Sequence, residues 1–129
     1  MNKKKNYDTK YWRADPEEHD YPAAVDYLEL LFEKPKVVSA VSRLKNSPTI
    51  VKKAKDILRA SQLPLLPKTN IHVKENLKKV KNGDKLSPVL LVTHDAKLHI
   101  ADGYHRVCAI YLLSEDLNVP CRLTKIEDK

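Results

Sequence analysis

The sequence predicts a small domain of the α/β class (α+β in the looser sense), in which a small mixed sheet follows an N-terminal helical layer. In residues 15–61 apolar side chains recur every three or four positions, which is typical of amphipathic helices. Residues 88–92 form a continuous apolar run after a proline, as in a strand that is buried on both faces. Residues 119–124 alternate apolar and polar side chains, as in a half-exposed strand. The first region predicts the helical layer, and the other two predict the sheet.

Length and composition limit the classes of protein that this chain can form. It has 129 residues, of which 42% are hydrophobic and 32% are charged, and this suits a single packed domain. Its longest apolar run is far shorter than the ~18–20 residues of a membrane-spanning helix. No apolar stretch follows the basic N-terminus, as it would in a secretory signal. We therefore expect a cytoplasmic protein with no membrane partner, whose Cys108 and Cys121 are reduced core residues.

We expect the chain to divide into a short leader and one domain. Residues 1–14 are polar and charged, and they predict a loosely ordered basic leader that the isolated Trp12 could anchor. Residues 15–129 form the single domain, with the helical layer at 15–61 and a sheet-containing core at 62–126.

Proline positions and apolar spacing predict three helices in the helical layer. The first runs over residues 22–32, and the second lies around residues 37–44. Ser47 and Pro48 have the sequence of an N-cap followed by a first-turn proline, so a third helix is expected over 48–60.

The predicted helix 48–60 carries basic side chains on one face and apolar side chains on the other. The basic ones are Lys52, Lys53, Lys55 and Arg59. The net charge of +7 is unevenly placed, since residues 14–33 contain seven acidic and no basic residues, whereas residues 34–60 contain eight basic and one acidic. These segments could pair across packed helices, or the basic face could bind nucleic acid. Nucleic acid is the less favoured partner, because no aromatic residues lie among these cations to stack on bases.

A proline-rich segment and a fourth helix connect the helical layer to the sheet. Two prolines within residues 63–67 exclude a helix and predict an extended segment or an edge strand. A helix is expected over 71–81, with Asn70 or Thr69 as its N-cap and Gly83 at its end. The side chains expected to face inward are Ile71, Leu77 and Val80.

The last third of the chain alternates strand and helix signals. The run 88–92 and the alternating residues 98–101 predict two strands joined by a turn at 94–97. Residues 104–113 repeat apolar side chains at helical spacing and predict a heavily buried helix. The strand 119–124 follows this helix.

The junction between the strand 98–101 and the helix 104–113 is the candidate site. Glycine occurs only twice in the chain, and Gly103 stands at this junction. The first amides of a helix have no partner within the helix, and together with the positive end of the helix dipole they attract anions. Gly103 would let a phosphate approach the backbone, Arg106 could grip its oxygens, and His105 could add a hydrogen-bond donor.

Asp102 is the only carboxylate inside this turn. It could hold a Mg²⁺ that arrives with a nucleotide, or accept a proton during a reaction. Simpler alternatives stay open for each residue. Asp102 could serve only as the helix N-cap, and Arg106 could pair only with Asp102 or Glu115. His105 could be an ordinary surface histidine.

From about residue 63 to residue 125, the chain resembles the ParB-like/sulfiredoxin-like superfamily in its order of strand, strand, glycine turn, helix and strand. In ParB-type proteins the turn is a Gly-Glu-Arg-Arg box that binds a nucleoside triphosphate. In sulfiredoxins it is Gly-Gly-Cys-His-Arg, whose histidine and arginine contact ATP phosphates. Gly103, His105 and Arg106 match the sulfiredoxin pattern, and the turn 102–106 is most similar to Asp-Gly-X-His-Arg versions. The resemblance implies a sheet of the ParB/sulfiredoxin type and nucleotide binding at residues 103–106.

Two features qualify what the resemblance implies. Tyr104 stands where sulfiredoxins carry their reactive cysteine, so peroxiredoxin repair is not expected, and the glutamate of the ParB box is also absent at this position. In sulfiredoxins the preceding helix supplies a lysine to ATP, and Lys74 is the candidate for that role in the helix 71–81.

The sequence therefore predicts binding of a nucleotide or other phosphorylated ligand at the turn 102–106, through Gly103, Tyr104, His105 and Arg106. Phosphoryl transfer or hydrolysis is the reaction that Asp102 and His105 could catalyse, with Mg²⁺ carried by the nucleotide. The alternative is a non-catalytic module that binds nucleic acid or protein through the helix 48–60. The superfamily includes nucleotide hydrolases, kinases and nucleases, so the resemblance alone does not choose among them.

Overall fold

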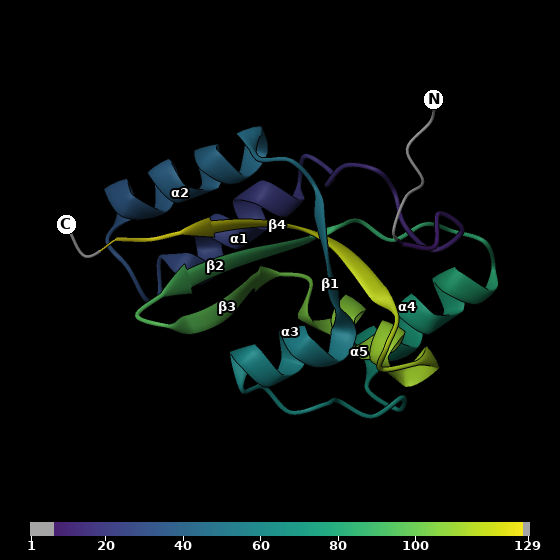
Figure 1. Ribbon diagram of the computed structural model, residues 1–129. Helices are drawn as coiled ribbons and strands as arrows, with labels where there is room; N and C mark the ends of the chain where they lie inside the picture. The colour runs from purple at the N-terminus through teal and green to yellow at the C-terminus, as the bar shows by residue number, and fades with distance from the viewer. Residues whose placement is uncertain (1–6, 128–129) are drawn as a thin grey trace.

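In the computed structural model, which describes residues 7–127, a mixed sheet of four strands has the order β1-β4-β2-β3 (Figure 1). The strands are β1 (Ile50–Lys53), β2 (Val89–His94), β3 (Lys97–Asp102) and β4 (Asn118–Lys125). The two central strands, β2 and β4, are parallel, and each pairs with an antiparallel edge strand. The parallel pair is connected through α5, which crosses one face of the sheet.

Helices cover both faces of the sheet. On one face lie α1 (Asp20–Leu28) and α2 (Lys34–Asn46), and on the other lie α3 (Ala54–Ser61), α4 (Ile71–Lys81) and α5 (Tyr104–Leu113) (Figure 1). Successive residues of β2 point to opposite faces, so Leu90 and Val92 pack with α1 and α2, whereas Val89 and Leu91 pack with the other three helices. The described residues thus form the predicted small α+β fold, with one core on each face.

The first four residues of β2 are all apolar, as expected of a strand that helices cover on both faces. All four residues from Val89 to Val92 are buried, which confirms the prediction from the apolar run. Asp95 and Ala96 both have positive φ, as a tight turn between right-twisted antiparallel strands requires, and they join β2 to β3.

The predicted helix over 48–60 is wrong in its first half. Residues Ile50–Lys53 form β1, which pairs antiparallel with β4, and only from Ala54 does the chain become helical. Ser47 ends α2 instead of capping a new helix. The layer predicted over 15–61 is therefore not wholly helical, and its last helix lies on the opposite face of the sheet from its first two.

The proposed basic face is also divided. Lys52 and Lys53 lie on the exposed end of β1, whereas Lys55 and Arg59 lie on α3. Lys55 pairs with Asp116 at 2.8 Å, and Arg59 pairs with Asp56 at 3.1 Å. The basic residues of this segment therefore do not form the continuous helical face that the alternative function needs.

Two strand predictions also need correction. Residues 63–67 form no strand, and the sheet edge beside β4 is occupied by β1. The strand β4 is not half exposed, because Val119, Pro120, Cys121 and Arg122 are all buried. Arg122 is buried beneath α2, where its guanidinium donates to the carbonyl oxygens of Leu44 and Lys45.

The helix α4 begins at the predicted cap, and two of the three residues predicted to face inward, Leu77 and Val80, pack against the core. The Asn70 side chain accepts hydrogen bonds from the amides of His72 and Val73, and Gly83 follows the helix with φ +83°. The prediction is wrong for Ile71, which is 68% exposed; Val73 is fully buried instead. Ile71, the first residue after the Asn70 cap, lies on the solvent-exposed side of the first turn of α4.

The segment before α1 lies beside the chain that leads into β2. Residues 1–6 of the predicted leader lie outside the described residues. Trp12 is buried, and the backbone on either side of it bonds to Leu86: Leu86 N donates to Tyr11 O, and Arg13 N donates to Leu86 O. This pairing brings Ser87 next to the start of α1.

Cys108 and Cys121 are both buried and form no disulfide, as predicted. Burial raises the pKa of Cys121 to about 12 and also raises the pKa of Cys108. Within residues 7–127, no helix combines the length and the apolar character needed to cross a membrane.

Candidate functional site

The turn between β3 and α5 depends on Gly103. Its φ of +110° is in the region that favours glycine, and a Cβ there would lie 3.0 Å from Arg106 Nη2 and 3.0 Å from Val89 Cγ2. The Arg106 side chain thus folds back over the glycine. The guanidinium of the same turn therefore fills the space that a side chain at position 103 would occupy.

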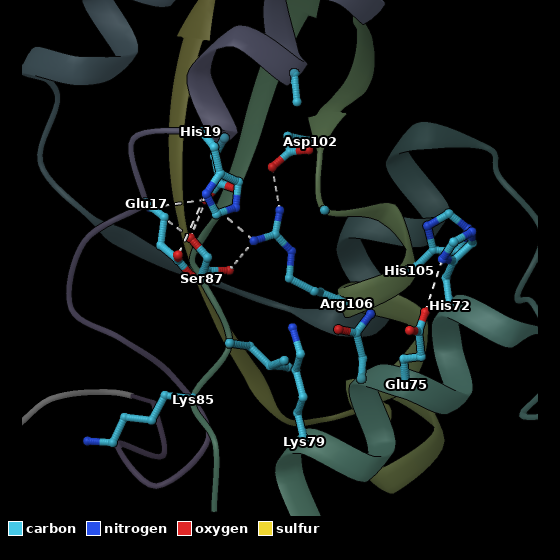
Figure 2. Close-up of a pocket in the computed structure, with 15 residues that line it drawn as sticks. Glu17, His19, His72, Glu75, Lys79, Lys85, Ser87, Asp102, His105 and Arg106 are labelled. Carbon is cyan, nitrogen blue, oxygen red and sulfur yellow. Dashed lines mark hydrogen bonds and ion pairs between the residues drawn. The ribbon is translucent and has the colours of Figure 1, made fainter.

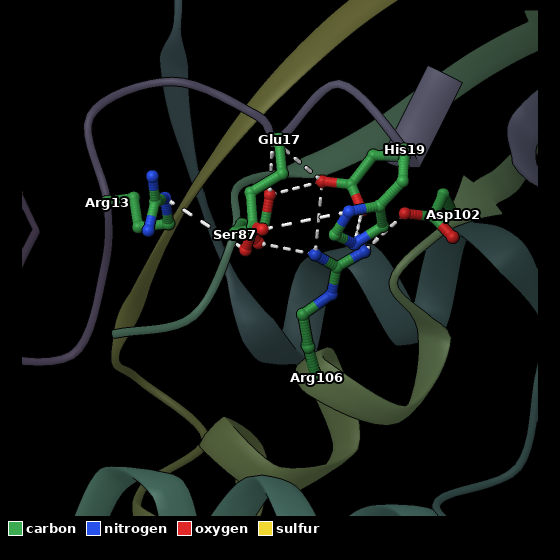
Figure 3. A network of polar contacts seen from close by, with 7 residues as sticks. Arg13, Glu17, His19, Ser87, Asp102 and Arg106 are labelled. Carbon is green, nitrogen blue, oxygen red and sulfur yellow. Dashed lines mark hydrogen bonds and ion pairs between the residues drawn. The ribbon is translucent and has the colours of Figure 1, made fainter. Parts of the chain in front are cut away.

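Arg106 is bound by groups of its own protein (Figure 3). Its Nη2 donates to Asp102 Oδ2 at 2.5 Å, and its Nη1 donates to the carbonyl oxygen of Ser87 at 2.9 Å. Nη1 also lies 3.5 Å from Asp20 Oδ2. The Arg106 side chain is only 12% exposed. The alternative in which Arg106 pairs with Asp102 is therefore the arrangement found, while Glu115 is not its partner.

Asp20, at the start of α1, is the buried member of this network. Its side chain is 5% exposed, and its Oδ2 accepts hydrogen bonds from the Ser87 hydroxyl and from the Glu17 amide. Oδ1 lies 3.5 Å from His19 Nε2. These donors, with Arg106, replace the water that the carboxylate loses on burial.

Sequence reasoning missed Asp20 and Ser87. Both are common residue types, and they lie 82 and 15 positions before Asp102 along the chain. No local pattern in the sequence relates them to the turn. The pairing of the Trp12 segment with Leu86 places Ser87 beside the start of α1.

The two carboxyl groups of the network have opposite pKa shifts. Burial, with the charge and hydrogen bond of Asp20, raises the pKa of Asp102 to about 6, although Arg106 acts in the other direction. Burial would also raise the pKa of Asp20, but the Ser87 hydroxyl, Arg106 and a hydrogen bond with Asp102 together hold that pKa below its usual value. As the pH falls, Asp102 is therefore protonated before Asp20.

A cleft of about 400 Å³ lies in front of Arg106 (Figure 2). It is bounded on one side by α4 and on the other by the start of α1, with the turn 102–106 at its base. Its charged and histidine side chains are Glu17, His19, Asp20, His72, Glu75, Lys79, Lys85, Asp102, His105 and Arg106. The cleft therefore places acidic, basic and titratable groups around one space.

Two histidines face each other where α4 meets α5 (Figure 2). The ring centroids of His72 and His105 are 4.8 Å apart, and His72 Nδ1 lies 3.3 Å from Glu75 Oε1. Burial, with a smaller effect of His72, lowers the pKa of His105. At neutral pH His105 is therefore mainly uncharged, with one ring nitrogen that donates and one that accepts.

The amino end of α5 opens toward this cleft. Gly103 occupies the N-cap position, and no side chain caps the helix within the described residues. The first amide bonded within α5 is that of Val107, which donates to Gly103 O at 3.0 Å. Asp102 pairs with Arg106 and does not serve as the predicted N-cap. The amides of the first turn are thus directed as an anion site requires.

Two of the residues predicted to bind the ligand lie outside the cleft. The Tyr104 hydroxyl donates to the carbonyl oxygen of Pro64 at 2.6 Å, which turns its ring toward the segment 63–67. Lys74 is exposed and does not line the cleft, whereas Lys79, on the same helix, does.

Asp102 is poorly placed for its predicted role as a Mg²⁺ ligand. Its Oδ2 is bound by the Arg106 guanidinium, whose positive charge disfavours a second cation there. Among residues 7–127, no group of three or more His, Cys, Asp or Glu side chains is arranged to hold a metal ion. The residues present therefore do not fit a resident magnesium site.

Comparison with protein-family models, with curated proteins and with solved structures finds no match to this chain.

Proposed function

We propose that the cleft binds a phosphorylated small molecule, such as a nucleotide, with a phosphate group at the amino end of α5. The observation that carries this proposal is the convergence of an uncapped helix terminus with His72, His105 and Lys79 at one cleft. Amide donors and the helix dipole attract an oxyanion. The histidine rings and a lysine supply further donors to the oxygens of a phosphate.

The role of Arg106 in this proposal differs from the predicted one. Its charge is already balanced by Asp102 and Asp20, and its Nη1 and Nη2 already donate to Ser87 and Asp102. The direct cationic contacts to phosphate are therefore assigned to Lys79 and Lys85. Arg106 holds the carboxyl groups beside the ligand.

We also propose that the chain is a distant member of the ParB-like/sulfiredoxin-like superfamily. The order β2, β3, glycine turn, α5, β4 supports this, as do Gly103, His105 and Arg106 in the turn. The edge strand β1 and the two helices on the other face are features that this resemblance does not cover.

Hydrolysis or transfer of the phosphoryl group is the reaction that this arrangement supports. Asp102 lines the cleft, and with a pKa of about 6 it is ionised at neutral pH but still a useful base. It would accept the proton of an attacking water or hydroxyl as the new O–P bond forms. The leaving oxygen would depart with the electrons of the broken P–O bond. His105 would donate a hydrogen bond to a phosphate oxygen.

Calorimetry with ATP and with pyrophosphate tests the binding proposal. Lys79→Ala should weaken binding by about 10- to 100-fold, the range for a lost charge-assisted hydrogen bond. Lys74→Ala is the matched control, because it removes the same charge from the same helix outside the cleft, and it should leave the affinity unchanged. Equal affinities for the wild type and Lys79→Ala, or no binding of either compound, would refute the proposal.

A further inference from the structure

Next to the candidate site, the carboxylate of Asp20 is buried. The Asp20 side chain is 5% exposed, and taking a carboxylate out of water is costly unless several donors replace the water. Three groups act on its Oδ2: the Ser87 hydroxyl, the Glu17 amide and Arg106 Nη1. They come from three separate parts of the chain. The carboxylate thus fixes the relative positions of α1, the approach to β2, and α5.

The guanidinium of Arg106 lies between Asp20 and Asp102. Its Nη1 faces Asp20 and the Ser87 carbonyl, and its Nη2 donates to Asp102. A guanidinium is planar and rigid, so contacts at one nitrogen restrict the direction of the other. The Asp102 side chain is 20% exposed and lines the cleft, whereas Asp20 is almost fully enclosed.

We infer that Asp20 is a positioning residue: with Ser87 it fixes the guanidinium of Arg106, and Arg106 in turn fixes the Asp102 carboxylate for proton transfer at the cleft. The inference rests on the proposed function, because Asp102 needs a reacting phosphate beside it. In the reaction the proton of the attacking hydroxyl moves to Asp102. Asp20 keeps its negative charge throughout, held by its donors.

Asp20→Asn tests this inference, because asparagine keeps the shape of the side chain and removes its charge. In the full-length protein, we expect phosphate release from ATP to slow at least 10-fold in kcat. The Kd for ATP should change less than threefold, since Asp20 does not contact the phosphate. Asp26→Asn is the matched control: it removes the same charge from an exposed position of α1, and its kcat should equal that of the wild type.

A second readout needs no ligand. In nitrogen-15 NMR of the free protein, an Arg106 guanidinium held at both nitrogens should give separate, slowly exchanging Nη signals. Asp20→Asn should average these signals, and Asp26→Asn should not. If Asp20→Asn does not fold, Ser87→Ala removes one donor to Asp20 and should give a smaller loss of the same kind.

The outcomes separate this inference from the proposed function. Unchanged Arg106 signals in Asp20→Asn, or an equal fall in kcat for Asp20→Asn and Asp26→Asn, would overturn the positioning role. A wild type that binds ATP without releasing phosphate would also overturn it, while leaving the binding proposal intact. A wild type that binds neither ATP nor pyrophosphate refutes the proposed function, whatever the NMR signals show.

Discussion

The motif around Arg106 indicates a contact with phosphate, but the Arg106 side chain is bonded within the protein. An arginine three residues after a glycine turn is typical of a phosphate contact, but here its nitrogens bond to Asp102 and Ser87. The motif places the candidate site at Gly103, where the backbone has positive φ. The sequence offered Asp102 as a partner of Arg106, but it could not reveal Asp20 and Ser87, which are distant along the chain and carry no signal of their own.

Gly103→Ala should destabilise the protein more than Gly83→Ala. Both positions have positive φ, so both variants carry backbone strain of about 1–3 kcal/mol. Only at Gly103 would the new Cβ also press on Arg106 and Val89, since nothing lies within 4 Å of a Cβ at Gly83. Urea denaturation measures both free energies of unfolding. Equal losses would contradict the close approach of Arg106 to the turn.

Asp102 should make the protein less stable as the pH rises from ~4 to ~7. Its pKa is about 6 in the folded protein, against a usual value of 3.8, so the folded state holds the proton more tightly. The stabilisation is complete below the lower pKa and is lost as the pH rises through the higher one. We expect the difference in unfolding free energy between the wild type and Asp102→Asn to fall by about 2 kcal/mol over this range. A difference that grows with pH would show instead that Arg106 dominates and lowers the pKa.

At the scale of elements, predictability depended on the length of each pattern. The helix α5 and the strands β2 and β3 were predicted closely, because their patterns extend over enough residues to be unambiguous. The strand β1 has only four residues, and Ile50 and Ala54 share a spacing that also suits a helix. Pairing with β4 decides between the two, and such tertiary pairing leaves no trace in a single sequence. The burial of β4 was also missed, because the packing of α2 over this strand is a tertiary contact that the local sequence does not show.

Asn70→Ala should loosen the first turn of α4 and, with it, His72. The Asn70 side chain accepts from the amides of His72 and Val73, and losing such a cap costs about 1 kcal/mol. Thr69 was the other predicted cap, and it makes no such contact in α4, so Thr69→Ala is the control. Thermal denaturation should show a loss for Asn70→Ala only, and ATP should bind this variant more weakly. Equal stability of the two variants would contradict the assigned cap.

In the whole molecule, the candidate site forms at an edge where helices from both faces of the sheet come together. Asp20 comes from the helical face that α1 and α2 form, whereas His72 and Arg106 come from helices on the other face. The turn at Gly103 was predictable from its local sequence. The cleft was not, because its two walls, the start of α1 and the helix α4, are about 50 residues apart in the chain and belong to separate cores.

A two-dimensional NMR titration of the full-length protein with pyrophosphate shows whether phosphate binds at the amino end of α5. We expect the largest shifts at the amides of Tyr104, His105 and Arg106, at the open end of α5, together with shifts in the signals of Lys79. Largest shifts at Lys52 and Lys53 on β1, or no shifts at any concentration, would contradict the claim that phosphate binds at this helix terminus.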